Sequence, residues 1–203
     1  MCSSDLSTKQ NTIPSGFEGR RVSERTVEFK HREGPWEIGH RISFDESGYG
    51  GKVSVFWTNT SKGTLPLVSI VNLREKVLPL KQATGFLPGI PTGRSSVLFG
   101  TSQETNWYDA EEFCKEDSPQ IASGQNHTID FMGFDHHYFL KVFLPESSRL
   151  SYNVQRAAKN PDGSCEFSIL TMMDQGSVAS GDSVSMDFKT WFGPKQKIGR
   201  AHV

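Results

Sequence analysis

The sequence predicts an all-β protein, either a sandwich or a barrel. Apolar and polar residues alternate along most of the chain, and this period of two is typical of strands whose side chains point in turn to opposite faces of a sheet. Clusters of Gly, Pro, Asn, Asp and Ser separate the alternating runs, as turns do between strands. A single segment has helical character, so at most one or two short helices are expected.

Alternating runs in the first half of the chain define the earliest expected strands. In residues 26–31, Val27 and Phe29 fall on one face, whereas Glu28 and Lys30 fall on the other. The same pattern predicts further strands at residues 36–44, 52–57, 67–73 and 95–100. Turns are expected between them at residues 46–51 and 61–66.

The second half of the chain continues the pattern. Strands are expected at residues 127–134, 138–145, 150–156, 165–172 and 183–192, with turns at residues 159–164 and 174–182. Within the first of these turns, the NPDG sequence ends in Gly163, which can take a positive φ, and therefore favours a hairpin. We expect the apolar residues of segments 138–144 and 165–170, Phe139 among them, to lie in the core.

The segment with helical character is residues 106–116, in which Asn106 is the expected N-cap and Asp109 and Glu112 lie near the positive end. It falls within residues 85–125, a long connection for a compact domain. Connections of this length tend either to carry structure of their own or to contact a partner.

Composition limits the size and class of the protein. A chain of 203 residues that is 35% hydrophobic can bury one sizeable core, whereas two full domains would be tight. The net charge of −1 argues against a nucleic-acid binder, which needs a basic face. No apolar run approaches the roughly 18 residues of a membrane span.

The two ends of the chain are expected to be foreign to it. Residues 1–6 (MCSSDL) and 198–203 (IGRAHV) correspond to DNA strings that are reverse complements over their shared length and look like a sequencing-library adapter. We therefore expect both ends to be artefacts of adapter read-through and exclude them from the fold. The domain is then expected at residues 7–197, as part of a longer protein.

Two cysteines, Cys114 and Cys165, remain once Cys2 is assigned to the foreign end. They could form a disulfide in an oxidising compartment, or they could be two separate buried thiols. The second interpretation is favoured, because free cysteine is usually a small core residue.

A compact group of metal-binding residue types occurs at Asp135, His136 and His137. Ligands from one strand normally lie two residues apart on one face, so Asp135 and His137 could share a metal but His136 points the opposite way. A third ligand, such as His40 or His127, would have to come from elsewhere in the chain. We therefore expect no metal and no other cofactor, and we interpret these polar residues as an exposed turn between two strands.

Two other segments carry residues common in functional sites. Residues 86–96 are rich in Gly and Pro but lack the Gly-Lys-Ser/Thr sequence of a phosphate-binding loop, so they are expected to form a rigid surface loop. His40, Arg41 and Asp45 lie along one expected strand and are expected to face solvent.

Two stretches resemble the YidC membrane protein insertases. Residues 131–145 (FMGFDHHYFLKVFLP) resemble a family pattern in which the matching positions are Gly133, Tyr138, Phe139, Leu140 and Pro145. The family's Lys before the Tyr is His137 here. The segment FKTWFGPK resembles the family's last periplasmic strand, with Gly193, Pro194 and Lys195 as the matching positions.

The resemblance implies part of the large periplasmic domain of a YidC-like insertase. That domain is a β-supersandwich similar to galactose mutarotases, and here it would be truncated at its N-terminal side. Insertion is carried by membrane helices outside this segment, so no catalytic residue is transferred. The implied location is the periplasmic side of the bacterial inner membrane, and the implied partners are translocon components of the SecDF or SecYEG kind and nascent membrane proteins.

Three functions stay open at this point. The favoured one is a periplasmic interaction and scaffold domain without catalysis of its own. The alternative is a carbohydrate-binding or mutarotase-like sandwich, which would need a His acid and a carboxylate base facing one cleft. No Glu follows Glu166, and the later Asp residues are expected in turns or on strand exteriors. The third is a secreted adhesion-type sandwich.

Overall fold

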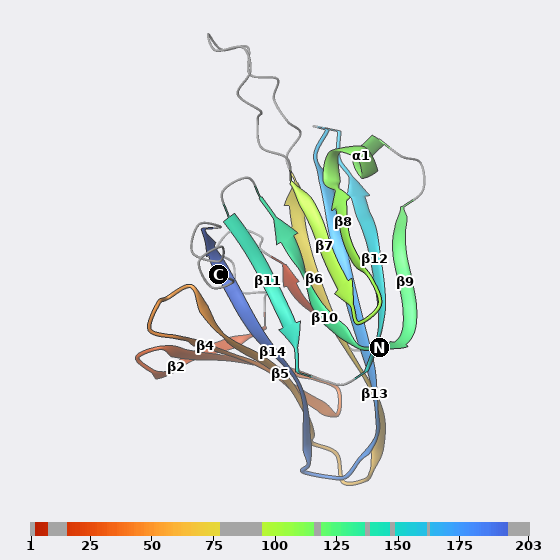
Figure 1. The fold of residues 1–203 in the computed structure, drawn as a ribbon. Coiled ribbons are helices and arrows are strands. Elements are labelled where there is room, and N and C mark those ends of the chain that lie inside the picture. The colour runs from red at the N-terminus through yellow and green to blue at the C-terminus, as the bar shows by residue number, and fades with distance from the viewer. Residues whose placement is uncertain are drawn as a thin grey trace, which may run out of the picture.

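The computed structural model describes residues 3–7, 16–77, 95–115, 119–136, 139–146, 149–161 and 163–194. These residues form two sheets that lie against each other as layers (Figure 1). The five-stranded sheet has the order β1-β6-β13-β12-β9, and the nine-stranded sheet has the order β2-β3-β4-β5-β14-β11-β10-β7-β8. All neighbouring strands are antiparallel except β1 and β6, which are parallel.

Ten of the strands in the described residues follow the expected runs, whereas those at residues 3–7, 18–23, 105–109 and 120–127 were not expected. The first of these four lies mostly in residues 1–6, which had been excluded from the fold. The five-stranded sheet contains β1 (Ser3–Ser7), β6 (Leu65–Val77), β9 (Gln120–His127), β12 (Leu150–Lys159) and β13 (Cys165–Val178). The nine-stranded sheet contains β2 (Glu18–Ser23), β3 (Thr26–Glu33), β4 (Trp36–Phe44), β5 (Gly50–Asn59), β7 (Ser96–Thr101), β8 (Thr105–Asp109), β10 (Ile129–Asp135), β11 (Phe139–Pro145) and β14 (Ser183–Pro194). The helix α1 spans Ala110–Lys115.

One hydrophobic cluster fills the space between the layers. Its largest fully buried side chains come from both sheets and include Trp57, Phe99, Met132, Phe167 and Phe188. In central strands such as β5 and β13, every second residue faces this cluster, as the alternation predicts. The expected sandwich is therefore confirmed, and the barrel alternative is wrong.

The predicted core residues are confirmed on one strand and partly wrong on another. Cys165, Phe167 and Ile169 of β13 are fully buried. On β11, by contrast, Leu144 is 40% exposed and Phe139 is 57% exposed, although Phe139 shares a strand face with the buried Phe143. The alternation therefore assigned Phe139 to the correct face of the strand. Phe139 is exposed because it is the first residue of β11, and the residues of this face become buried only further along the strand.

Two predicted turns have different outcomes. The NPDG hairpin is confirmed, because Gly163 has a φ of 79° and its N–H donates to the Asn160 carbonyl at 3.0 Å. The predicted turn at 174–182 is too long, because β13 continues to Val178 through a register shift next to Gly176, which has a φ of 67°. Gly176 thus permits a bulge inside the strand, and the chain reverses at residues 179–182.

The first part of the predicted helix is a β-strand instead. Residues 105–109 form β8, and α1 begins only at Ala110, where the Glu112 N–H donates to Asp109 Oδ1 at 3.4 Å. Asp109 therefore occupies the capping position that was expected for Asn106. The connection 85–125 carries structure of its own, since it contains β7, β8, α1 and most of β9. Residues 78–94, with most of the predicted Gly- and Pro-rich loop, lie outside the described residues.

A disulfide joins Cys114 of α1 to Cys165 at the start of β13, with 5.9 Å between the two Cα atoms. The favoured interpretation of two separate thiols is therefore wrong. The two cysteines are 51 residues apart in sequence, and only the packing of α1 against the five-stranded sheet brings them together. Arg156 of β12 supports the same contact, because its Nη1 donates to the Phe113 carbonyl at 2.7 Å.

Within the described residues, no helix is both long and apolar enough to cross a membrane.

Candidate functional site

A shallow groove of about 460 Å³ lies on the outer face of the nine-stranded sheet. We call it the outer-face groove, and its lining residues come from β2, β3, β4, β5 and β14: Arg20, Glu28, Lys30, Arg41, Ser54, Phe56, Thr58, Ser183, Ser185 and Asp187. These strands extend to one side of the sandwich, away from α1 and β9 (Figure 1).

Strand register places these side chains side by side. One row across the sheet consists of the paired positions Ser185, Phe56, Gly39 and Lys30. The next row consists of Asp187, Ser54, Arg41, Glu28 and Arg20. Because positions two apart on a strand share a face, both rows point away from the core, while the buried Ile38, Val55 and Trp57 point into it.

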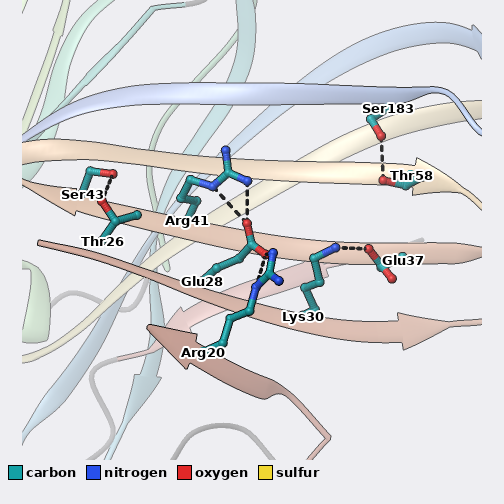
Figure 2. Close-up of polar contacts among 9 residues, drawn as sticks. All are labelled: Arg20, Thr26, Glu28, Lys30, Glu37, Arg41, Ser43, Thr58 and Ser183. Atoms are coloured by element: carbon teal, nitrogen blue, oxygen red, sulfur yellow. Dashed lines mark hydrogen bonds and ion pairs between the residues drawn. The ribbon is translucent and has the colours of Figure 1, made fainter. Parts of the chain in front are cut away.

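A buried carboxylate stands at one wall of the groove. Glu28 Oε1 accepts from Nε and Nη2 of Arg20 at 3.0 and 2.6 Å, and Glu28 Oε2 accepts from the same atoms of Arg41 at 3.0 and 2.6 Å (Figure 2). The Glu28 side chain has no exposed surface, whereas those of Arg20 and Arg41 are 67% and 52% exposed. The two guanidinium groups therefore cover the carboxylate and hold it in place.

The electrostatics of Glu28 follow from this geometry. Burial by itself would raise the pKa of the carboxyl group, but the hydrogen bonds from Arg41 and Arg20 outweigh it and hold the pKa below its usual value of 4.5. Glu28 is thus ionised at neutral pH, and its charge fixes the orientation of both arginines.

An aromatic ring forms the floor of the groove. The tip of the Phe56 ring lies over Gly39 on the neighbouring strand, where a Cβ atom would collide with the ring. Lys30 Nζ and Arg41 Cζ lie 5.7 and 5.9 Å from the ring centroid, so two cations flank the ring. Lys30 also donates to Glu37 Oε1 at 2.6 Å (Figure 2).

Hydroxyl groups and one carboxylate form the opposite wall. Thr58 and Ser183 are hydrogen-bonded through their hydroxyls at 2.7 Å, as Figure 2 shows. Asp187 accepts from the Ser185 hydroxyl at 3.1 Å and lies 3.7 Å from Lys52 Nζ. Both carboxylates that line the groove are therefore already bound to neighbouring side chains, which makes the groove better suited to binding than to proton transfer.

A second polar group lies between the two sheets. Glu75 of β6 accepts from Lys141 Nζ at 2.6 Å, and its other oxygen lies 3.4 Å from Nε2 of His136. The Glu75 side chain is 11% exposed. Burial would raise its pKa, but the neighbouring His136 and Lys141 lower it below its usual value of 4.5. Both carboxylate oxygens are therefore engaged, although a His faces a carboxylate as acid–base chemistry would require.

The residues weighed as metal ligands do not converge. Asp135 is buried in β10, and His136 exchanges backbone hydrogen bonds with Phe139 at 2.8 and 3.1 Å across the turn to β11. The turn is confirmed, but the expected exposure of Asp135 is wrong. In the part of the chain that the structure describes, no three His, Cys, Asp or Glu residues are grouped to hold a metal. His137 lies outside that part, so the absence of a metal stays a prediction.

The two distant histidines have packing environments of their own. His40, expected to face solvent, is buried, with its ring 5.2 Å from that of Phe17. Burial lowers the pKa of His40 to about 4. His127 packs edge-on against Tyr152 at 5.8 Å. Arg41 and Asp45 are exposed as expected.

The glycines of the two family-like motifs lie at close approaches of the backbone. A Cβ at Gly133 would collide with the Lys141 carbonyl of the neighbouring strand, and one at Gly193 would meet the ring of Tyr49. Leu140 and Pro145 are half-buried in β11, and Pro194 is the last residue of β14. Tyr138 and Lys195 lie outside the described residues. A functional role for the motif residues stays a prediction.

Sequence reasoning missed Glu28 and Glu75 as candidate site residues. Glu28 appears in the sequence as an ordinary charged residue on a strand exterior, and its partners come from two other strands. Glu75 and Lys141 are 66 residues apart. Alternation gives the face on which a side chain lies, but neither the sequence nor its spacing gives the neighbour across the sheet.

The family described as the YidC periplasmic domain matches residues 13–198. No curated protein matches the sequence. Among solved structures, a candidate aldose 1-epimerase from Escherichia coli K12 has a TM-score of 0.54 at 10% identity, and the match covers 88% of this chain and 68% of that one.

Two further solved structures have similar folds. A TPR-domain containing protein from Parabacteroides distasonis has a TM-score of 0.50 at 13% identity, with 87% of this chain and 34% of that one covered. A galactose mutarotase-like protein from Lactobacillus casei has a TM-score of 0.49 at 11% identity, with 87% and 72% covered. At these identities the likeness concerns the fold alone, a mutarotase-like β-sandwich. The match over residues 13–198 goes further, and the chain belongs to the YidC periplasmic domain family.

Proposed function

We propose that this chain is an interaction and scaffold domain of a YidC-like insertase, which supports the insertion and folding of inner-membrane proteins and has no catalysis of its own. The observation that carries the proposal is the family match over residues 13–198. The geometry supports it, because Glu28, Glu75 and Asp187 each hold neighbouring side chains in place.

The family places the chain on the periplasmic side of a membrane-anchored parent protein. We propose that the membrane is the bacterial inner membrane and that the partners are translocon components of the SecDF or SecYEG kind, together with nascent membrane proteins. The disulfide between Cys114 and Cys165 supports this location, since disulfides persist in the periplasm.

The end of β14 supports a fixed connection to the rest of the parent. Phe192 N–H donates to the Tyr49 carbonyl at 2.6 Å, and the next residue, Gly193, lies under the Tyr49 ring. Pro194 follows as the last residue of the strand, paired with Phe139. Proline cannot donate to a sheet ladder, so it suits a strand end. Gly193 and Pro194 then set the direction in which the chain leaves the sheet.

The test is a deletion of residues 18–194 in the full-length parent protein. We expect insertion of simple membrane-protein substrates to stay largely intact, whereas co-purification of translocon components falls. A matched variant, Pro194→Ala, should keep most of the stability of the domain but reduce co-purification. Unchanged co-purification after the deletion would contradict the scaffold proposal.

A mutarotase-like activity is the second candidate, and the facing pair of His136 and Glu75 favours it. The burial of Glu75 argues against it, because the side chain is 11% exposed and Lys141 already holds one of its oxygens at 2.6 Å, which leaves little access for a sugar. Polarimetry of freshly dissolved α-D-glucose with the purified chain decides the matter. A catalysed approach to equilibrium that Glu75→Gln abolishes would replace the scaffold proposal by an enzymatic one.

A further inference from the structure

We propose that the outer-face groove binds an acidic, extended segment of a partner protein, with a carboxylate of that segment held by Arg20 and Arg41. The inference deepens the proposed function, because it names the kind of partner chain that the domain recruits. It is carried by three features of the groove: its excess positive charge, its fixed guanidinium groups and its aromatic floor.

The charge balance favours an anion. Two guanidinium groups share the single carboxylate of Glu28, so this cluster carries one positive charge in excess. The other charged groups of the groove are balanced. Lys30 pairs with Glu37. Asp187 belongs to a cluster in which two cations, Lys52 and Lys189, face two carboxylates, Asp187 and Glu146. The excess therefore lies on the side of β2, β3 and β4, and a negatively charged partner is the complementary one.

The arginines are prepared to receive a carboxylate. A guanidinium group has five N–H donors, and Arg20 and Arg41 each direct two donor atoms at Glu28, which leaves N–H donors on both groups for a further acceptor. Both side chains are more than half exposed, yet each is fixed by two hydrogen bonds. Such a planar, oriented donor set matches the two oxygens of a carboxylate.

The remainder of the groove suits a peptide better than a small ion. Phe56 provides an apolar floor for a neighbouring side chain, between the two flanking cations. The hydroxyls of Ser54, Thr58, Ser183 and Ser185 line the side towards β14, where they can donate to or accept from a peptide backbone. Asp187 lies on that same side and repels a second anion, so it keeps the acidic side chain against Arg20 and Arg41.

The experiment measures binding of fluorescein-labelled peptides to the full chain by fluorescence anisotropy at low and physiological salt. The probe is a ten-residue peptide of alternating Glu and Ser, and its matched control has Gln in place of every Glu. We expect the acidic peptide to bind and the Gln peptide to bind at least about tenfold more weakly, which corresponds to roughly 1.4 kcal/mol. Added salt should weaken the binding of the acidic peptide, because the attraction is between partly exposed charges.

Variants assign the binding to the groove. Arg20→Gln leaves the contact between Arg41 and Glu28 in place and should lower the affinity for the acidic peptide about tenfold. Ser54→Glu removes no charged group and places a competing carboxylate in the row of Arg41, so it should have a similar effect. Lys189→Gln is the matched control, since Lys189 lies on the same sheet face outside the groove and is 71% exposed. Thermal melting of each variant shows whether it is folded.

Equal affinity for the two peptides, or an unchanged affinity in both Arg20→Gln and Ser54→Glu, would overturn the inference. Binding to vesicles of phosphatidylglycerol, with no binding of either peptide, would also overturn it and assign the groove to a lipid surface. Failure of the scaffold proposal is distinguishable, because it shows as unchanged co-purification after the deletion, whereas peptide binding is measured on the isolated chain.

Discussion

Glu28 of β3 and Arg41 of β4 are register partners across the sheet, and Arg41 donates to one carboxylate oxygen from both Nε and Nη2, at 3.0 and 2.6 Å. A charge without exposed surface requires such partners, because an ionised carboxylate removed from water is strongly destabilising when it is unpaired. The pairing therefore explains how a sheet face exposed to solvent can carry an inaccessible glutamate.

The first prediction concerns this pair. Arg41→Ala should lower the free energy of unfolding by about 1–3 kcal/mol, because it leaves half of the Glu28 carboxylate without a donor. Lys189→Ala, an exposed cation on the same face, should change it by less than about 0.5 kcal/mol. Urea unfolding of both variants measures the difference. Equal midpoints for the two variants would mean that the cluster does not contribute to stability.

The second prediction concerns the two phenylalanines of β11. Phe143→Ala should cost about 3–5 kcal/mol, since Phe143 is 8% exposed and packs against Phe188 and Phe192. Phe139→Ala should cost less than about 1 kcal/mol, because more than half of the side chain is already exposed. Chemical unfolding of the two variants tests the ranking, and a larger loss at Phe139 would contradict it.

The third prediction concerns pH. The pKa of His40 is lowered from 6.5 to about 4, so the unfolded chain takes up its proton first as the pH falls. The neutral His40 therefore contributes its full stabilisation of the folded chain above pH 6.5. This contribution, roughly 3 kcal/mol of unfolding free energy, is lost as the pH falls from 6.5 to about 4. Glu28 and Glu75, with lowered pKa values, add a further loss below pH 4.5.

The variant His40→Gln isolates the first of these effects. Its unfolding free energy should fall less between pH 7 and pH 4 than that of the unmodified chain, by roughly 3 kcal/mol. NMR titration of the His40 ring provides an independent check, with an expected midpoint near pH 4. A midpoint near 6.5 would show that the ring is accessible to water.

The fourth prediction concerns the disulfide. Unfolded without reductant, the chain should show one reactive thiol, that of Cys2, because Cys114 and Cys165 are joined. The double variant Cys114→Ser with Cys165→Ser should lose about 2–4 kcal/mol of stability, since the bond closes a loop of some 51 residues in the unfolded chain. Three reactive thiols would show that the bond does not form.

The fifth prediction concerns Gly133. A Cβ there would collide with the Lys141 carbonyl of β11, a backbone atom that cannot move without disturbing the ladder, so Gly133→Ala should cost about 1–3 kcal/mol. Gly63→Ala is the matched control, because no atom lies within 4 Å of the added Cβ and its φ is not positive. Similar melting temperatures for the two variants would contradict the packing account of this glycine.

The sequence by itself determined the strands, their faces and several of their turns. Alternation depends on neighbours along the chain, so the outward position of Glu28, the inward position of Phe167 and the turn at Gly163 were all predictable from local rules. Local rules also misplaced the start of α1, because residues 105–109 join the edge of the sheet next to β7 instead of a helix.

Only the tertiary structure decided which distant residues meet. Glu28 becomes inaccessible because Arg20 and Arg41 approach it from two other strands, and Cys114 reaches Cys165 because α1 packs on the start of β13. Phe139 is exposed because it lies at the end of its strand, although its face is the apolar one. Periodicity fixes the direction of a side chain, whereas burial and pairing depend on the layers and strands that stand opposite, and these are set by the packing of the whole chain.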